Sequence, residues 1–89
     1  MYKLIWDDSF VRKLRKLTKN NKQIGELFQS RIELLEIEPF HPILKTHKLQ
    51  GKLRNYYSCY LDFKYRLVFE IIDKITIQLI DIGTHDEVY

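Results

Sequence analysis

The spacing of apolar residues changes along the chain, from a helical repeat to an alternating one. Tyr2–Trp6 is a short apolar segment that predicts a strand, and Asp7–Ser9 supplies side chains able to cap a helix. Apolar residues then recur at helical spacing in two stretches separated by Asn20-Asn21, which predicts a helical hairpin. The first stretch holds Phe10, Val11, Leu14 and Leu17, and the second holds Ile24, Leu27, Phe28, Ile32 and Leu35.

The connection after the second helix contains two prolines. Pro39 and Pro42 lack the backbone donor that a helix needs, and each restricts the residue before it. A structured loop is therefore expected over Phe40–Leu53, between the helical half of the chain and the rest.

From Tyr56–Phe63 onward the apolar period is two, which is typical of strands. Four apolar residues of this segment are expected on one face, which is core, whereas the polar-tipped side chains between them fall on a face left free for function. The four are Tyr57, Cys59, Leu61 and Phe63. Two more strands are expected, a central one that is nearly all apolar and a last one that Gly83 ends. They cover Tyr65–Ile72 and Ile75–Ile82.

The predicted element order is β-α-α-β-β-β. It describes an α+β domain with a two-helix hairpin packed on one face of a small antiparallel sheet. A chain of 89 residues is too short for a second core, so residues 1–89 are expected to form a single domain.

Composition indicates where the protein is located and how its cysteine is used. Apolar residues make up 45% of the chain, and neither a signal-peptide layout nor a long apolar run is present, so we expect a cytoplasmic globular protein. The single cysteine, Cys59, has no partner for an internal disulfide and is expected to be a small buried residue.

The net charge of +3 is unevenly distributed along the chain. Residues 41–66 hold six Lys/Arg against one Asp/Glu, whereas residues 67–89 hold one against five. A second basic run contains no acid at all. Such clusters favour a polyanionic partner, since each phosphate neutralised releases counterions, although two solvated faces would give the same counts. The second run comprises Arg12, Lys13, Arg15, Lys16, Lys19 and Lys22.

Arg66 lies inside a strand that is otherwise almost entirely apolar. Its guanidinium must be partly desolvated or must reach the open face, and either is costly without a partner. The planar set of donors matches a phosphate, and it equally matches a carboxylate such as Asp62 or Asp81. Anion binding and a structural ion pair are both open on this evidence.

The histidines differ in their sequence surroundings. His47 lies in a loop without apolar periodicity, where an imidazole can transfer a proton near neutral pH, although most loop histidines do not. His85 follows the last predicted strand, where it can turn back over the sheet or remain a solvated tail residue. His41, between Phe40 and Pro42, is expected to pack within the loop.

Cations and tyrosines accompany these residues. The cations of the loop around Gly51 have no acidic neighbours, and such a cluster is suited to holding the backbone of an RNA strand. The tyrosines of the open face and of the last position are suited to stacking unpaired bases, although strand tyrosines also pack as half-buried residues. The candidate RNA contacts are Lys45, Lys48, Lys52, Arg54, Tyr56, Tyr60 and Lys64, with Tyr89 at the last position.

Several other chemistries lack their motifs. The chain has no glycine-rich phosphate loop, no nucleophile elbow and no Cys/His zinc spacing. Asp86 and Glu87 would point apart in an extended tail, which is a poor arrangement for a shared metal. We therefore expect neither a metal nor another cofactor.

Three segments together resemble the RelE/YafQ branch of the RelE/ParE superfamily, the toxins of type II toxin–antitoxin systems. They are LKTHKLQG at residues 44–51, YRLVF at residues 65–69 and IGTHDEVY at residues 82–89, and their order and spacing also match. The resemblance covers almost the whole chain and implies the RelE-like microbial RNase fold. It further implies a toxin that cuts mRNA in the A site of the 30S ribosomal subunit without a metal and that a cognate antitoxin silences.

The resemblance also assigns residues. It implies that His47 and His85 are the catalytic histidines, that Arg66 binds the scissile phosphate and that Tyr89 is the carboxy-terminal aromatic residue. Two positions depart from the YafQ pattern, which has a histidine in place of Tyr60 and an aspartate in place of Lys64. The catalytic set is thus intermediate between the histidine-rich and the Arg/Lys/Tyr types, and His47 and His85 can exchange the roles of base and acid.

Two other readings use the same fold. A ParE-like toxin would inhibit DNA gyrase without catalysis, but such proteins lack the loop histidine and the terminal Gly-Thr-His that this chain has. A degenerate member would act only as the partner of an antitoxin-type DNA-binding protein.

Overall fold

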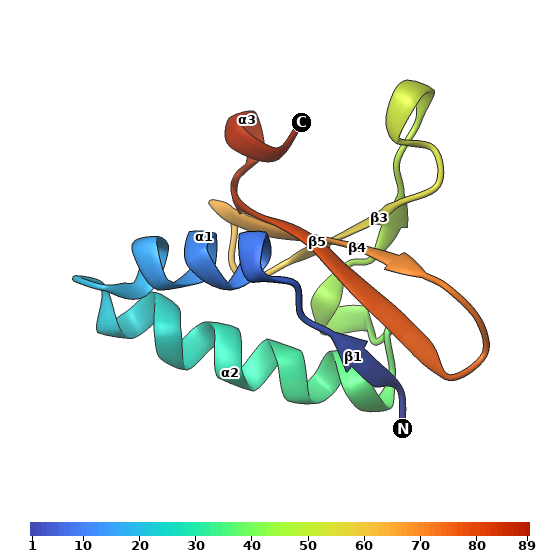
Figure 1. Cartoon of the computed structure of the whole chain (residues 1–89), viewed down its shortest axis with the longest axis horizontal. Coiled ribbons are helices and arrows are strands. Elements are labelled where there is room, and N and C mark those ends of the chain that lie inside the picture. The colour runs from blue at the N-terminus through green and yellow to red at the C-terminus, as the bar shows by residue number, and fades with distance from the viewer.

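Both predicted helices are present, and they pack on one face of a five-stranded sheet (Figure 1). The computed structural model describes residues 1–89. Helix α1 (Asp8–Thr18) is capped by Asp7, which accepts a hydrogen bond of 2.7 Å from the N–H of Phe10. Helix α2 (Lys22–Ile37) is capped by Asn21, so the asparagine that separates the helices also starts the second one. No helix is both long enough and apolar enough to cross a membrane.

The sheet has the strand order β1-β5-β4-β3-β2. The α+β class is confirmed, with one correction to the antiparallel sheet: β1 runs parallel to β5. The chain leaves β1 through two helices rather than through a tight hairpin, so no turn imposes an antiparallel arrangement. The strands are β1 (Lys3–Ile5), β2 (His47–Lys48), β3 (Tyr57–Tyr60), β4 (Tyr65–Ile71) and β5 (Thr76–Thr84).

The expected loop over residues 40–53 contains short ordered elements. These are the 3-10 turn η1 (Pro42–Leu44), strand β2 and the 3-10 turn η2 (Gly51–Leu53). His41 caps η1 by accepting a 3.1 Å hydrogen bond from the N–H of Ile43, and Lys45 reverses the chain with a left-handed φ of 49°. Strand β2 then pairs with β3, which extends the sheet by one short edge strand.

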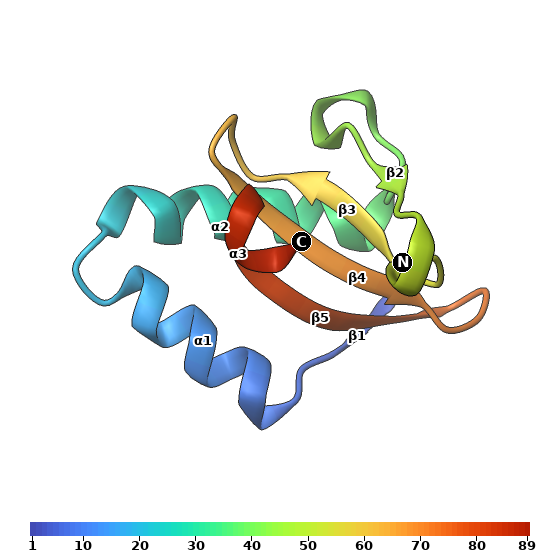
Figure 2. The same cartoon turned by 90° about the horizontal axis from the view of Figure 1, so that it is seen from above.

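The core lies between the helices and one face of the sheet. Alternation in β3 and β4 places Cys59, Leu67 and Phe69 on this face, and all three are fully buried, which confirms the burial expected of Cys59. Phe63, which was expected on the same face, is instead 87% exposed, because β3 ends at Tyr60 and Phe63 lies in the turn before β4. Burial raises the pKa of the Cys59 thiol to about 12, and the charge of Arg31 offsets this only in part. The thiol is therefore neutral at physiological pH. The opposite face of β3, β4 and β5 is covered by no helix except the short α3 (His85–Val88), seen from above in Figure 2.

Candidate functional site

Arg66 lies in the middle of the open face of the sheet. It pairs with Tyr60 of β3 on one side and with Gly83 of β5 on the other. Its guanidinium carbon is 3.6 Å from the centre of the Tyr60 ring, which is close enough for a cation–π interaction. Nη1 donates to the main-chain oxygens of Asp62 at 2.8 Å and Tyr65 at 3.2 Å. Arg66 is only 7% exposed, and these contacts hold its guanidinium in a fixed orientation.

The structural ion pair considered for Arg66 is absent. The Asp62 carboxylate instead accepts the N–H groups of Lys64 and Tyr65, because it closes the turn before β4. The Asp81 carboxylate is paired with Lys13 at 2.5 Å. Arg66 thus keeps its charge without an acidic partner, and donors other than Nη1 remain for an anion.

His47 joins the open face through β2. It is the direct partner of Ser58 in β3, and direct partners in a sheet point to the same face. Its Nδ1 lies 3.2 Å from the main-chain oxygen of Lys45. A carbonyl oxygen can only accept, so Nδ1 carries the hydrogen and Nε2 is left with a free lone pair. The exposed imidazole is thus arranged to take up a proton at Nε2.

The end of the chain folds back over this face instead of forming an extended tail (Figures 1 and 2). Strand β5 does not end at Gly83 but continues to Thr84, which starts α3 with a capping box. Glu87 Oε1 accepts from the N–H of Thr84 at 2.7 Å, and the Thr84 side chain accepts from the N–H of Glu87. A Cβ atom at Gly83 would lie 3.1 Å from Glu87 Oε1, so glycine permits this close approach.

Helix α3 and the residue that follows it bring two aromatic side chains, His85 and Tyr89, close to the β3 residue that pairs with His47. The rings of His85 and Tyr89 meet edge to face, with centres 4.4 Å apart. The Tyr89 hydroxyl donates to Oγ of Ser58, which in turn is the sheet partner of His47. His47, Ser58, Tyr89 and His85 are therefore successive neighbours beside the Tyr60–Arg66 pair.

Not every candidate residue lies in this cluster. The ammonium group of Lys45 is 5.3 Å from the Tyr60 ring centre, but that of Lys64 is at the same distance from the Tyr65 ring instead. Tyr56 precedes β3, where its carbonyl oxygen accepts from the N–H of Leu49. The remaining cations are exposed in β2 and between β2 and β3. They are Lys48 in β2, Lys52 in η2 and Arg54 after η2.

Ser58 is the functional candidate that sequence reasoning missed. It is fully buried, yet its hydroxyl accepts from Tyr89 and links the end of the chain to β3. The alternation of β3 already placed it on the open face next to Tyr60, which was the available signal. No group of three or more His, Cys, Asp or Glu side chains is arranged to hold a metal ion.

The capping box makes a pH-dependent contact. The N–H and hydroxyl of Thr84, and more weakly Lys13 and Lys64, hold the pKa of Glu87 below its ordinary value of 4.5. Because the pKa is lowered, the contact is complete above pH 4.5 and is lost as the pH falls through the lowered pKa. We expect the amide resonance of Thr84 in an NMR titration to shift in that acidic range, and Glu87→Gln to abolish this shift. An unchanged titration in Glu87→Gln would contradict the contact.

Known proteins share both the sequence pattern and the architecture of this chain. The model of a family described as the bacterial toxin of type II toxin–antitoxin systems, YafQ, matches residues 2–89. None of the curated proteins compared with the chain matches it.

Solved structures share the fold over the full chain. A copper-bound mutant toxin from Helicobacter pylori is 27% identical with a TM-score of 0.77, and the match covers 100% of both chains. YafQ from E. coli strain BL21(DE3) is 18% identical with a TM-score of 0.81, covering 100% of this chain and 99% of that one. The E. coli DinJ–YafQ toxin–antitoxin complex matches at 19% identity and a TM-score of 0.79, covering 99% and 97%. The two-helix, open-sheet architecture is common to all three.

Proposed function

Since the chain belongs to the YafQ family of toxins of type II toxin–antitoxin systems, we propose that it is a metal-independent endoribonuclease. Its substrate is mRNA in the A site of the 30S ribosomal subunit, so that cleavage inhibits translation. The observation that carries this proposal is the row of His47, Ser58, Tyr89 and His85 beside the partner-free charge of Arg66. Proton-transfer groups next to a cation are the parts that phosphodiester cleavage requires.

In the proposed reaction a ribose 2′-hydroxyl attacks its own adjacent phosphate. His47 Nε2 takes the proton from the 2′-oxygen while that oxygen forms a bond to phosphorus. The bond from phosphorus to the 5′-oxygen breaks, and His85 supplies the proton to the leaving 5′-oxygen. The products are a 2′,3′-cyclic phosphate and a 5′-hydroxyl, and the roles of the two histidines can be exchanged.

Arg66 stabilises the charge that develops on the phosphoryl oxygens. Its orientation is set by the carbonyl oxygens of Asp62 and Tyr65 and by the Tyr60 ring, so it needs little reorganisation when that charge appears. Tyr60 and Tyr89 orient the neighbouring base. The RNA strand is held by Tyr56, which precedes β3, and by the cations Lys45, Lys48, Lys52, Arg54 and Lys64.

A cognate antitoxin is the proposed protein partner. E. coli YafQ, which has the same fold, has been crystallised with DinJ as a toxin–antitoxin complex. The basic surface of this chain suits an acidic, partly disordered segment of such a partner. A toxin that acts on ribosome-bound mRNA would work in the cytoplasm.

Cleavage mapping tests this function. Purified protein is incubated with a transcript, with and without programmed ribosomes, and the products are mapped by primer extension. We expect new 5′ ends within codons only when ribosomes are present, and 3′ ends that carry a cyclic phosphate. Intact mRNA together with inhibition of gyrase supercoiling would instead establish the ParE-like function.

A further inference from the structure

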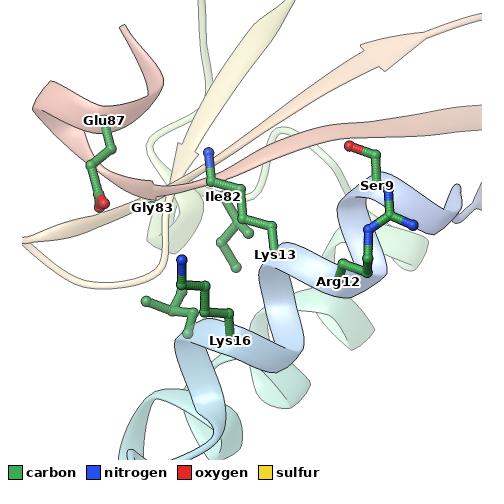
Figure 3. Close-up of a pocket in the computed structure, with 8 residues that line it drawn as sticks. Ser9, Arg12, Lys13, Lys16, Ile82, Gly83 and Glu87 are labelled. Atoms are coloured by element: carbon green, nitrogen blue, oxygen red, sulfur yellow. The ribbon is translucent and has the colours of Figure 1, made fainter.

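A basic cavity lies beside the site, between α1, the end of β5 and α3 (Figure 3). Its volume is about 610 Å³. Arg12, Lys13 and Lys16 line it from α1, and Gly83 and Glu87 line it from the opposite side. No role in the proposed reaction uses these cations.

Two of the three cations in the cavity are free. Lys13 is paired with Asp81 across the edge of β5, and Glu87 is engaged by Thr84 in the capping box. Arg12 and Lys16 take part in no ion pair, although they are four residues apart on one face of α1. Like charges at this spacing destabilise a helix, and an anion between them would relieve the repulsion.

The cavity adjoins the site at Gly83. This residue lines the cavity and is also the direct sheet partner of Arg66, and the Glu87 side chain, which lines the cavity too, lies over it. The strand order puts β5 and the cavity on one side of Arg66, and β3 with β2 on the other. The loop that carries Lys45 and Lys48 lies on that other side. Cationic groups thus flank Arg66 on both sides of β4.

We propose that this cavity is a second phosphate site, which binds a phosphate of the RNA strand on the β5 side of the scissile one. This inference rests on the proposed function, because that function places the RNA strand across β4 at Arg66. Arg12 would supply a planar pair of donors to the phosphate and Lys16 a point charge. An acidic protein segment could also meet these cations, but the cavity lies beside β5, directly next to the strand that carries Arg66, and this position favours the RNA strand that Arg66 holds.

The test is binding of a strand that cannot be cut, with a 2′-deoxy nucleotide at the cleavage position. Affinity is measured by fluorescence anisotropy over a range of salt concentrations, for the full chain and for the double variant R12Q/K16Q. The control R15Q/K19Q removes the same charge from the last turn of α1 and the residue that caps it, but neither residue lines the cavity. Thermal melting of all three proteins checks that they remain folded.

For R12Q/K16Q we expect the slope of log K against log salt to become about 0.7 less negative, because the variant no longer neutralises the one phosphate in the cavity. Relative to about 1 M salt, this slope change corresponds to about 5-fold weaker binding of the strand at 0.1 M salt, whereas the control should change binding less than about two-fold. Equal weakening of RNA binding in both double variants would contradict the second phosphate site, because it would show that only the overall positive charge matters. Unchanged RNA binding in R12Q/K16Q, with weaker binding of an acidic antitoxin peptide, would assign the cavity to a protein partner instead.

Failure of this inference can be told apart from failure of the proposed function. If the unmodified protein cuts ribosome-bound mRNA but R12Q/K16Q binds the strand as tightly as it does, only the second site is wrong. If the unmodified protein neither cuts mRNA nor binds the strand at low salt, both proposals are wrong.

Discussion

Replacing His47 by alanine is expected to lower the rate of mRNA cleavage by about 10²- to 10⁴-fold, the usual loss when a positioned acid or base is removed. The hydrogen bond from Nδ1 to the Lys45 carbonyl leaves Nε2 free to accept the 2′-hydroxyl proton, and alanine removes this acceptor. The measurement is the single-turnover rate on programmed ribosomes, with binding to the ribosome followed separately.

His41→Ala is the matched control for this prediction. His41 caps η1 through Ile43 and is not part of the row of Ser58, Tyr89 and His85. Its loss should leave the cleavage rate within a few-fold of normal. If both histidine variants cut at the same rate as the unchanged chain, His47 is not the base. If His85→Ala alone then lowers the rate by about 10²- to 10⁴-fold, His85 of α3 is the base instead.

Replacing Arg66 by alanine is expected to lower the cleavage rate by about 10²- to 10³-fold, as is typical when a donor that stabilises transition-state charge is lost. Arg66→Lys should recover only part of the rate. An ammonium group keeps the charge but lacks the planar donors that can contact the carbonyl oxygens and a phosphate together. Ribosome-bound substrate again provides the assay, with kcat and KM determined separately.

Arg54→Ala provides the comparison for Arg66→Ala, because Arg54 is exposed in the loop before β3. Removing it should raise KM slightly and leave kcat unchanged, since it contacts the strand and not the transition state. An Arg66→Ala variant that raised KM with an unchanged kcat would mean that Arg66 only holds the strand. Full recovery of kcat by lysine would mean that charge alone is sufficient.

Much of the fold followed from periodicity in the chain. Helical spacing located α1 and α2 to within a few residues, because each buries one apolar stripe. Alternation located the open face of β3, and with it the side of the sheet that carries Tyr60 and Arg66.

Shorter and longer-range features were harder to predict. Strand β2 has two residues, too few to show any period, and its register with β3 is what places His47 beside Ser58. Thr84 and Glu87 have the spacing of a capping box, but the six residues that follow Gly83 suggested a tail. The pairing of Lys13 with Asp81 joins residues 68 positions apart, which no local pattern records.

The buried thiol of Cys59 has a practical consequence. Only the thiolate reacts with alkylating reagents, and this side chain is both inaccessible and neutral in the folded protein. Because it is the only cysteine in the chain, any labelling must come from molecules whose core has opened. The rate of labelling therefore measures how often the sheet separates from its helices, without the introduction of a probe.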